Sequence, residues 1–137
     1  PTGAPYDGAG FLKLLDPDLV AVLGAVDKQV GTITLDGGGQ DLFSDKVFLL
    51  SGVEVYGLSG GGTGEAPYLY YKSMAPSPTT GALDGRIKYL GSSASRWWLR
   101  SPHSSGTSAP RTVHLDGNVS SNHASGRYGV APAVVIV

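Results

Sequence analysis

Glycine breaks this chain into short segments and so excludes any long helix. It occupies 21 of the 137 positions, and five of the eight residues from 57 to 64 are glycine. Glycine destabilises helix interiors and is favoured in turns. Charged residues, which normally cover the solvent face of a long helix, make up only 15% of the sequence. These features exclude a helical bundle or a coiled coil, and we expect short elements joined by many turns.

Two short helices are expected in the first half of the chain. After an apolar turn at residues 11–15, Asp16 is a predicted N-cap with Pro17 at the first helical position. We expect this helix to end near Gly24 and to bury an apolar stripe at positions 19, 20, 22 and 23. Ser51 opens an S-x-x-E capping box, which predicts a second helix.

The strand pattern completes an α+β domain that occupies residues 1–137 as one unit without internal repeats. An Asp-Gly turn between alternating apolar residues at 113–121 predicts a hairpin. The apolar run at 130–137 is expected to be a buried terminal strand, because an unpaired strand of this kind would aggregate. Alternation or apolar runs also predict strands at 31–35, 47–50 and 96–100. We expect the strand at 96–100 to be central in its sheet.

Charge and composition exclude several functional classes. The net charge of −1 argues against a nucleic-acid-binding domain. The absence of cysteine excludes disulfides, zinc–thiolate sites and thiol nucleophiles. No run of 18 apolar residues occurs, so membrane insertion is not expected. The charge is nevertheless uneven: residues 1–95 carry six cations and ten acids, whereas residues 96–137 carry four arginines and one acid.

Two patterns that suggest chemistry have simpler structural interpretations. Ser59 lies in a G-x-S-x-G sequence, but a nucleophile elbow requires a strand before it and a helix after it, and here a glycine run surrounds it. Asp16 and Asp18 suggest calcium, yet helix capping explains both and the EF-hand pattern is absent. No catalytic residue and no nucleotide-binding motif is therefore predicted.

The histidines also fail to define a metal site. His103, His114 and His123 are spaced by 11 and 9 residues, which matches no compact ligand motif, and Asp116 is the one acid near them. We predict no metal. Asn118 begins an N-x-S sequon, but an asparagine is expected in this hairpin for its turn preference.

Residues 103–128 have the composition of a binding surface. Ser, Gly, His, Asn, Arg, Thr and Tyr dominate this segment, which lies between two strongly apolar strands and contains the predicted hairpin. Small polar residues with Tyr and Arg are typical of antibody paratopes. Loops on a rigid frame are also where binding function concentrates. The alternative interpretation is a polar loop set without a role.

Four blocks occur in order along the chain: D-K-V-F-L-L-S at 45–51, W-W-L-R-S-P at 97–102, D-G at 116–117 and G-V-A-P-A at 129–133. This series resembles a family of C-type-lectin-like domains common in microbial and phage proteins. This group shares the lectin fold of the formylglycine-generating enzyme. It includes the variable proteins of diversity-generating retroelements, in which a reverse transcriptase miscopies template adenines, mainly in AAY asparagine codons.

The resemblance implies a diversified C-terminal region on an invariant scaffold. Changing the first two bases of AAY cannot produce Lys, Glu, Gln, Met or Trp, and residues 101–137 contain none of these, whereas residues 1–100 contain twelve. The scaffold would comprise residues 1–95, Trp97 to Arg100 and the strand at 130–137. The variable, ligand-binding face would be drawn from His103, Ser104, Ser105, Thr107, Ser108, Arg111, His114, Ser120, Ser121, Asn122, His123, Ser125, Arg127 and Tyr128.

The family comparison also suggests what this chain does not do. It has no cysteine for formylglycine chemistry and no E-P-N or W-N-D calcium triplet, so neither enzyme activity nor a cofactor is expected. We expect a binding module that recognises a protein or glycan on another cell, displayed on a virion surface such as a tail tip or on a cell surface. Several copies would favour avidity. The alternative is a structural or assembly domain of a phage tail or surface protein with the same fold and no diversification.

Overall fold

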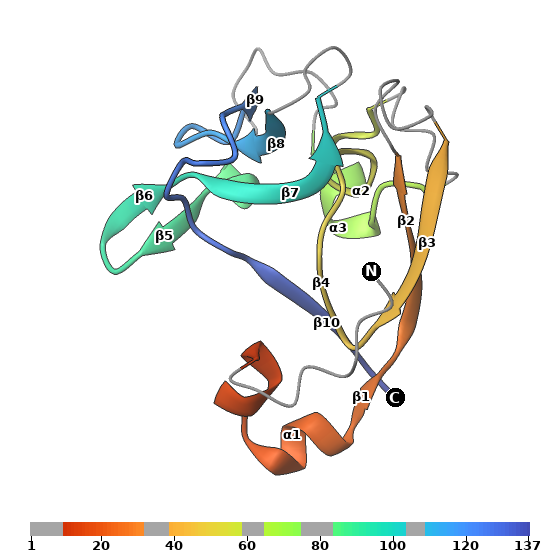
Figure 1. The fold of residues 1–137 in the computed structure, drawn as a ribbon. Coiled ribbons are helices and arrows are strands. Elements are labelled where there is room, and N and C mark those ends of the chain that lie inside the picture. The colour runs from red at the N-terminus through yellow and green to blue at the C-terminus, as the bar shows by residue number, and fades with distance from the viewer. Residues whose placement is uncertain (1–9, 32–38, 59–64, 75–83, 104–108) are drawn as a thin grey trace.

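A computed structural model of the chain describes residues 10–31, 39–58, 65–74, 84–103 and 109–137. Short helices and several small antiparallel sheets make up this mixed α/β domain, as the sequence predicts (Figure 1). Ser59 and the proposed face residues at 104, 105, 107 and 108 lie outside the described residues.

Each helix in the described residues is five residues long or shorter. The predicted caps are confirmed: Asp16 accepts a hydrogen bond from the Asp18 amide at 2.9 Å, and Ser51 and Glu54 form a complete capping box. In chain order the helices are the 3₁₀ helix η1 (Phe11–Leu14), α1 (Pro17–Ala21), α2 (Gly52–Tyr56), α3 (Leu69–Lys72) and the 3₁₀ helix η3 (Asp84–Arg86).

Helix α1 is shorter and more exposed than predicted. It ends at Ala21 because Leu23 and Gly24 leave the helix to pair with the last strand. Of the predicted buried stripe, only Leu23 is buried, whereas Leu19 and Val22 are exposed. The predicted stripe is therefore wrong, because its residues belong to two different elements, α1 and β1.

Within the described residues, ten strands form four separate antiparallel sheets. The sheets have the orders β1-β10-β4, β2-β3, β5-β6 and β7-β8-β9. The strands are β1 (Leu23–Gly24), β2 (Val26–Gly31), β3 (Gln40–Asp45), β4 (Val47–Leu49), β5 (Lys88–Leu90), β6 (Ser93–Ser95), β7 (Trp97–Pro102), β8 (Pro110–Val113), β9 (Val119–Ser121) and β10 (Pro132–Ile136). Of the predicted strand at 31–35, Gly31 is the last residue of β2, and residues 32–35 lie outside the described residues.

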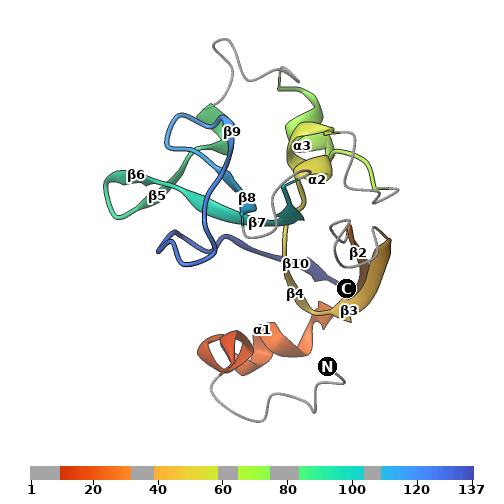
Figure 2. The same cartoon turned by 45° about the horizontal axis from the view of Figure 1, so that its top comes forward.

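Strand β10 is paired as predicted but is not buried. It lies between β1 and β4, and runs from the neighbourhood of β6 and β7 towards β1 (Figures 1 and 2). Pairing satisfies its backbone, but a sheet of three short strands leaves Ile136 67% exposed and Val137 83% exposed. The expectation of a buried terminal strand is therefore wrong for the side chains.

Strand β7 carries the centre of the core, although it lies at a sheet edge rather than in the predicted central position. On its other side the Trp98 amide donates to the Gly129 carbonyl at 3.0 Å, in an isolated parallel bridge, and the Arg100 amide donates to the Leu50 carbonyl at 3.0 Å. A Cβ on Gly129 would lie only 3.1 Å from the Arg96 carbonyl, so glycine permits this close approach. The core comprises Val55, Tyr56, Tyr71, Trp97, Leu99 and Val113.

Candidate ligand-binding surface

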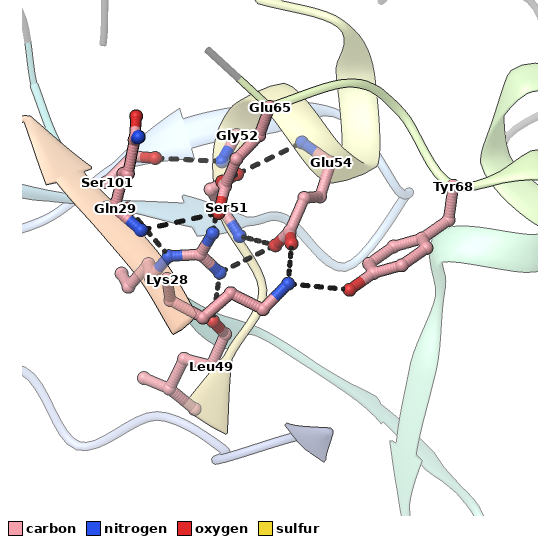
Figure 3. A network of polar contacts seen from close by, with 10 residues as sticks. Lys28, Gln29, Leu49, Ser51, Gly52, Glu54, Glu65, Tyr68 and Ser101 are labelled. Carbon is pink, nitrogen blue, oxygen red and sulfur yellow. Dashed lines mark hydrogen bonds and ion pairs between the residues drawn. The ribbon is translucent and has the colours of Figure 1, made fainter. Parts of the chain in front are cut away.

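A buried ionic network fixes the framework beneath the candidate surface. Glu54 on α2 accepts from Lys28 at 2.7 Å and from Arg100 on β7 at 2.6 Å (Figure 3). Its carboxylate also accepts from the Ser51 amide at 2.8 Å, which is half of the capping box. One carboxylate therefore joins β2, α2 and β7.

The network continues through the segment before α3. Glu65 pairs with Arg100 and accepts from the Ser51 hydroxyl at 3.1 Å, while Lys28 donates to the Tyr68 hydroxyl at 2.8 Å. Burial raises the pKa of Glu54, but the hydrogen bonds from Arg100 and Lys28 outweigh it, and the net pKa is lowered. Each buried charge has an opposite partner, so we assign this cluster to the framework rather than to a reactive site.

The β8–β9 hairpin is anchored to this framework at its turn. The hydroxyl of Tyr56, on α2, donates to the Gly117 carbonyl at 2.6 Å, and burial raises the pKa of this tyrosine. Gly117 has φ of 82°, the left-handed conformation that favours glycine. Asp116 accepts from the Asn118 amide at 3.0 Å, which lowers the Asp116 pKa to about 2, and also pairs with His114 at 2.9 Å. The predicted hairpin is confirmed.

Strand register divides the predicted variable residues between two faces. Arg111 pairs with Ser121, and the next pair, Thr112 with Ser120, must point to the opposite side. Arg111 points towards α2, where a Cβ on Gly52 would lie 3.5 Å from its Cδ, and burial lowers the Arg111 pKa. Arg111 and Ser121 are therefore not neighbours of Ser120 on one continuous surface.

The opposite side of this sheet carries a connected polar and aromatic cluster. Asn122 donates to the Thr112 hydroxyl at 3.2 Å and accepts from the Tyr128 hydroxyl at 3.1 Å. The Tyr128 ring packs against Trp98 with 5.1 Å between ring centres. We call the cluster on this side the outer face, and it comprises Arg96, Trp98, Ser120, Asn122 and Tyr128, with the buried Thr112 beneath them.

Three further predicted residues project beside the outer face. His123, Ser125 and Arg127 are all exposed, and a backbone hydrogen bond from Gly126 to the His123 carbonyl at 2.8 Å closes a turn among them. The segment is therefore held at its turn and, through Tyr128, at its end, while its side chains remain open to solvent.

The other predicted residues lie elsewhere. His103 is half-buried next to β7, with its amide donating to the Ala109 carbonyl at 3.2 Å, and His114 is half-buried at the hairpin. The side-chain oxygen of Asn118 is buried within the hairpin, which agrees with a turn role rather than an exposed sequon. Within the described residues, no three histidine or carboxylate side chains gather in a way that would hold a metal ion.

Sequence reasoning missed two members of the outer face. The sequence places Trp98 in the scaffold and does not include Arg96 in the predicted face, yet Trp98 touches Tyr128, and Arg96 donates to the Ser120 hydroxyl at 3.3 Å. A signal was present: adjacent residues of a strand point to opposite faces, so Trp97 and Trp98 could not both enter the core. Trp97 is the buried one, at 1% exposure.

Comparison with known proteins places the chain in one family. A family model described as a domain of unknown function, DUF6273, matches residues 8–137, so the chain belongs to that family. No curated protein and no solved structure matches the chain. In the part of the chain that the structure describes, no helix has the length and apolar character needed to span a bilayer.

Proposed function

We propose that this DUF6273 domain is a non-catalytic binding module with a C-type-lectin-like fold, and that its ligand contacts the outer face and the exposed residues beside it. One observation carries the proposal: the segment from Asn122 to Tyr128 is held to the sheet at both ends, while His123, Ser125 and Arg127 project into solvent. A surface that is already ordered loses less entropy on binding than a free loop.

The same arrangement supports diversification of this surface. Exposed positions away from caps and cores usually change stability by within about 0.5 kcal/mol when substituted. The absence of Lys, Glu, Gln, Met and Trp from residues 101–137 agrees with mutation of AAY codons. We therefore propose a variable protein of a diversity-generating retroelement, displayed on a virion or cell surface, that binds a protein or glycan on another cell without a cofactor.

A matched pair of display libraries tests the binding role. One library randomises His123, Ser125 and Arg127, and the other randomises Lys72, Tyr89 and Leu90, which are exposed on α3 and β5. Both are selected against the same test protein, lysozyme, after sorting for folded display. We expect binders mainly from the first library. Binders from the second library alone, or loss of folding throughout the first, would overturn the proposal.

Diversification has its own test at the gene. Sequencing the locus in many members of one population should reveal a near-identical copy of the 3′ segment, with differences confined to adenines. An unvarying segment without such a copy would leave a module of fixed specificity.

An apolar groove favours the second candidate, an assembly domain of a phage tail or surface protein. The groove has a volume of about 500 Å³ and lies between α3 and the β10–β4 pair, with Phe48, Leu69, Tyr70, Val134 and Val135 among its lining residues. Exposed apolar surface of this kind often marks a protein contact. If the alternative holds, Tyr70→Ser combined with Val135→Ser should abolish self-association in sedimentation measurements. Outer-face variants should leave it unchanged.

A further inference from the structure

The outer face holds a positive charge that no carboxylate of the described segments neutralises. The guanidinium carbon of half-buried Arg96 lies 5.9 Å from the centre of the Tyr128 ring, and one of its amino groups donates to Ser120. No carboxylate among the described residues lies within ion-pair distance of Arg96 or of exposed Arg127. The Tyr128 ring and the Ser120 hydroxyl therefore fix the orientation of the Arg96 guanidinium without neutralising its charge.

The remaining donors of Arg96 are free to meet a ligand. A guanidinium carries five N–H donors in a planar fork that matches a carboxylate. The bond to Ser120 is the one hydrogen bond that the Arg96 guanidinium donates within the described part of the chain. Because the side chain is already positioned, a carboxylate that binds it gains a charge-assisted bond at a reduced entropic cost.

The surroundings of Arg96 fit a protein partner better than a sugar. Val130 follows the glycine whose carbonyl accepts a hydrogen bond from the Trp98 amide, and its side chain is 63% exposed. Apolar side chains next to Trp, Tyr and Arg are typical of the centres of protein–protein interfaces. We infer that the outer face and the exposed Arg127 beside it bind an acidic protein surface. In this complex the guanidinium groups of Arg96 and Arg127 would pair with carboxylates of the partner. The inference rests on the proposed binding function.

Selection of peptides tests this inference with defined probes. A random peptide library displayed on phage is selected against the full chain, and the enriched peptides are synthesised for titration. We expect them to be richer in Asp and Glu than the starting library. Arg96→Gln and Arg127→Gln should each weaken binding about tenfold, the lower end for a hydrogen bond to a charged group. Added salt should weaken binding as well.

Lys72→Gln is the matched control, because it removes an exposed cation on α3. Its affinity should equal that of the parent. Near-neutral peptides that depend on His123 and Ser125 but not on the arginines would overturn the inference and leave the proposed function standing. Peptides insensitive to every outer-face change would overturn both. Arginine-dependent binding of polygalacturonate but of no acidic peptide would overturn the protein partner in favour of an acidic glycan.

Discussion

Arg96 and Arg100 lie four residues apart around the start of β7, yet their surroundings differ completely. Arg100 is 6% exposed at its side chain and contacts two carboxylates, those of Glu54 and Glu65. Arg96 contacts a hydroxyl and an aromatic ring, and no carboxylate among the described residues. The arginine of the framework is thus neutralised, whereas the arginine on the face proposed for binding keeps its charge available.

The largest expected effect comes from the buried member of the tryptophan pair. Trp97→Ala should lower the free energy of unfolding by about 3–5 kcal/mol. We expect a loss near the upper end of this range, because the change also removes the hydrogen bond that the indole N–H donates to the Arg86 carbonyl at 2.9 Å. Trp98→Ala should cost clearly less, since Trp98 is only half-buried. Urea denaturation of both variants measures the difference, and equal losses would refute the assignment of Trp97 to the core.

The next effect concerns the shared carboxylate of the framework. Glu54→Gln should destabilise the fold by about 3 kcal/mol, because Lys28 and Arg100 would remain buried with too little negative charge. Glu65→Gln should cost less, since Glu65 is the more exposed carboxylate and makes one ion pair rather than two. Denaturation at neutral pH tests this order, and the reverse order would contradict the central role of Glu54.

A smaller effect is expected on the outer face. Asn122→Ala removes hydrogen bonds to Thr112 and Tyr128 and should destabilise the fold by about 1 kcal/mol. Ser125→Ala, at an exposed position in the same segment, should change stability by less than about 0.5 kcal/mol. Thermal melting of the two proteins compares them. Identical melting temperatures would mean that Asn122 does not hold the segment.

The smallest effect is an acid-dependent one at the hairpin. The Asn118 amide lowers the Asp116 pKa from 3.8 to about 2 in the folded protein. A lowered pKa stabilises the fold above the unfolded value, and this contribution fades as pH falls from about 4 through about 2. NMR titration of the Asp116 carboxyl should give a midpoint near 2 that His114→Ala moves only slightly. A midpoint near 3.8 would show that the Asn118 bond is not formed.

Local sequence signals predicted local structure well. Asp16 with Pro17, the capping box at Ser51 and the turn at Gly117 all formed where expected, because each depends on hydrogen bonds or φ preferences within a few residues. The ionic network gave no such signal. Lys28 and Glu54 are 26 positions apart, and nothing in either neighbourhood identifies the other as its partner.

Predictions about burial and faces were weaker for a related reason. The apolar run at β10 predicted a paired strand correctly, but burial depends on what covers the sheet, which composition does not reveal. The candidate face was drawn from a continuous stretch of sequence, whereas strand alternation sends Arg111 and Ser120 to opposite sides. Trp98, which the sequence assigns to the scaffold, and Arg96, which it assigns to neither set, both belong to the outer face.

The position of β10 between β1 and β4 has a consequence for how the domain folds. Its pairing joins residue 136 to residue 23, and β1 and β4 do not pair with each other. Both remain open edges until β10, the last of the described elements to be synthesised, arrives. Closure over so long a stretch of chain is slow. The proposed variable segment immediately precedes β10. Substitutions in that segment must therefore still allow β10 to pair with β1 and β4, so the proposed diversification would be limited first by folding and only then by binding.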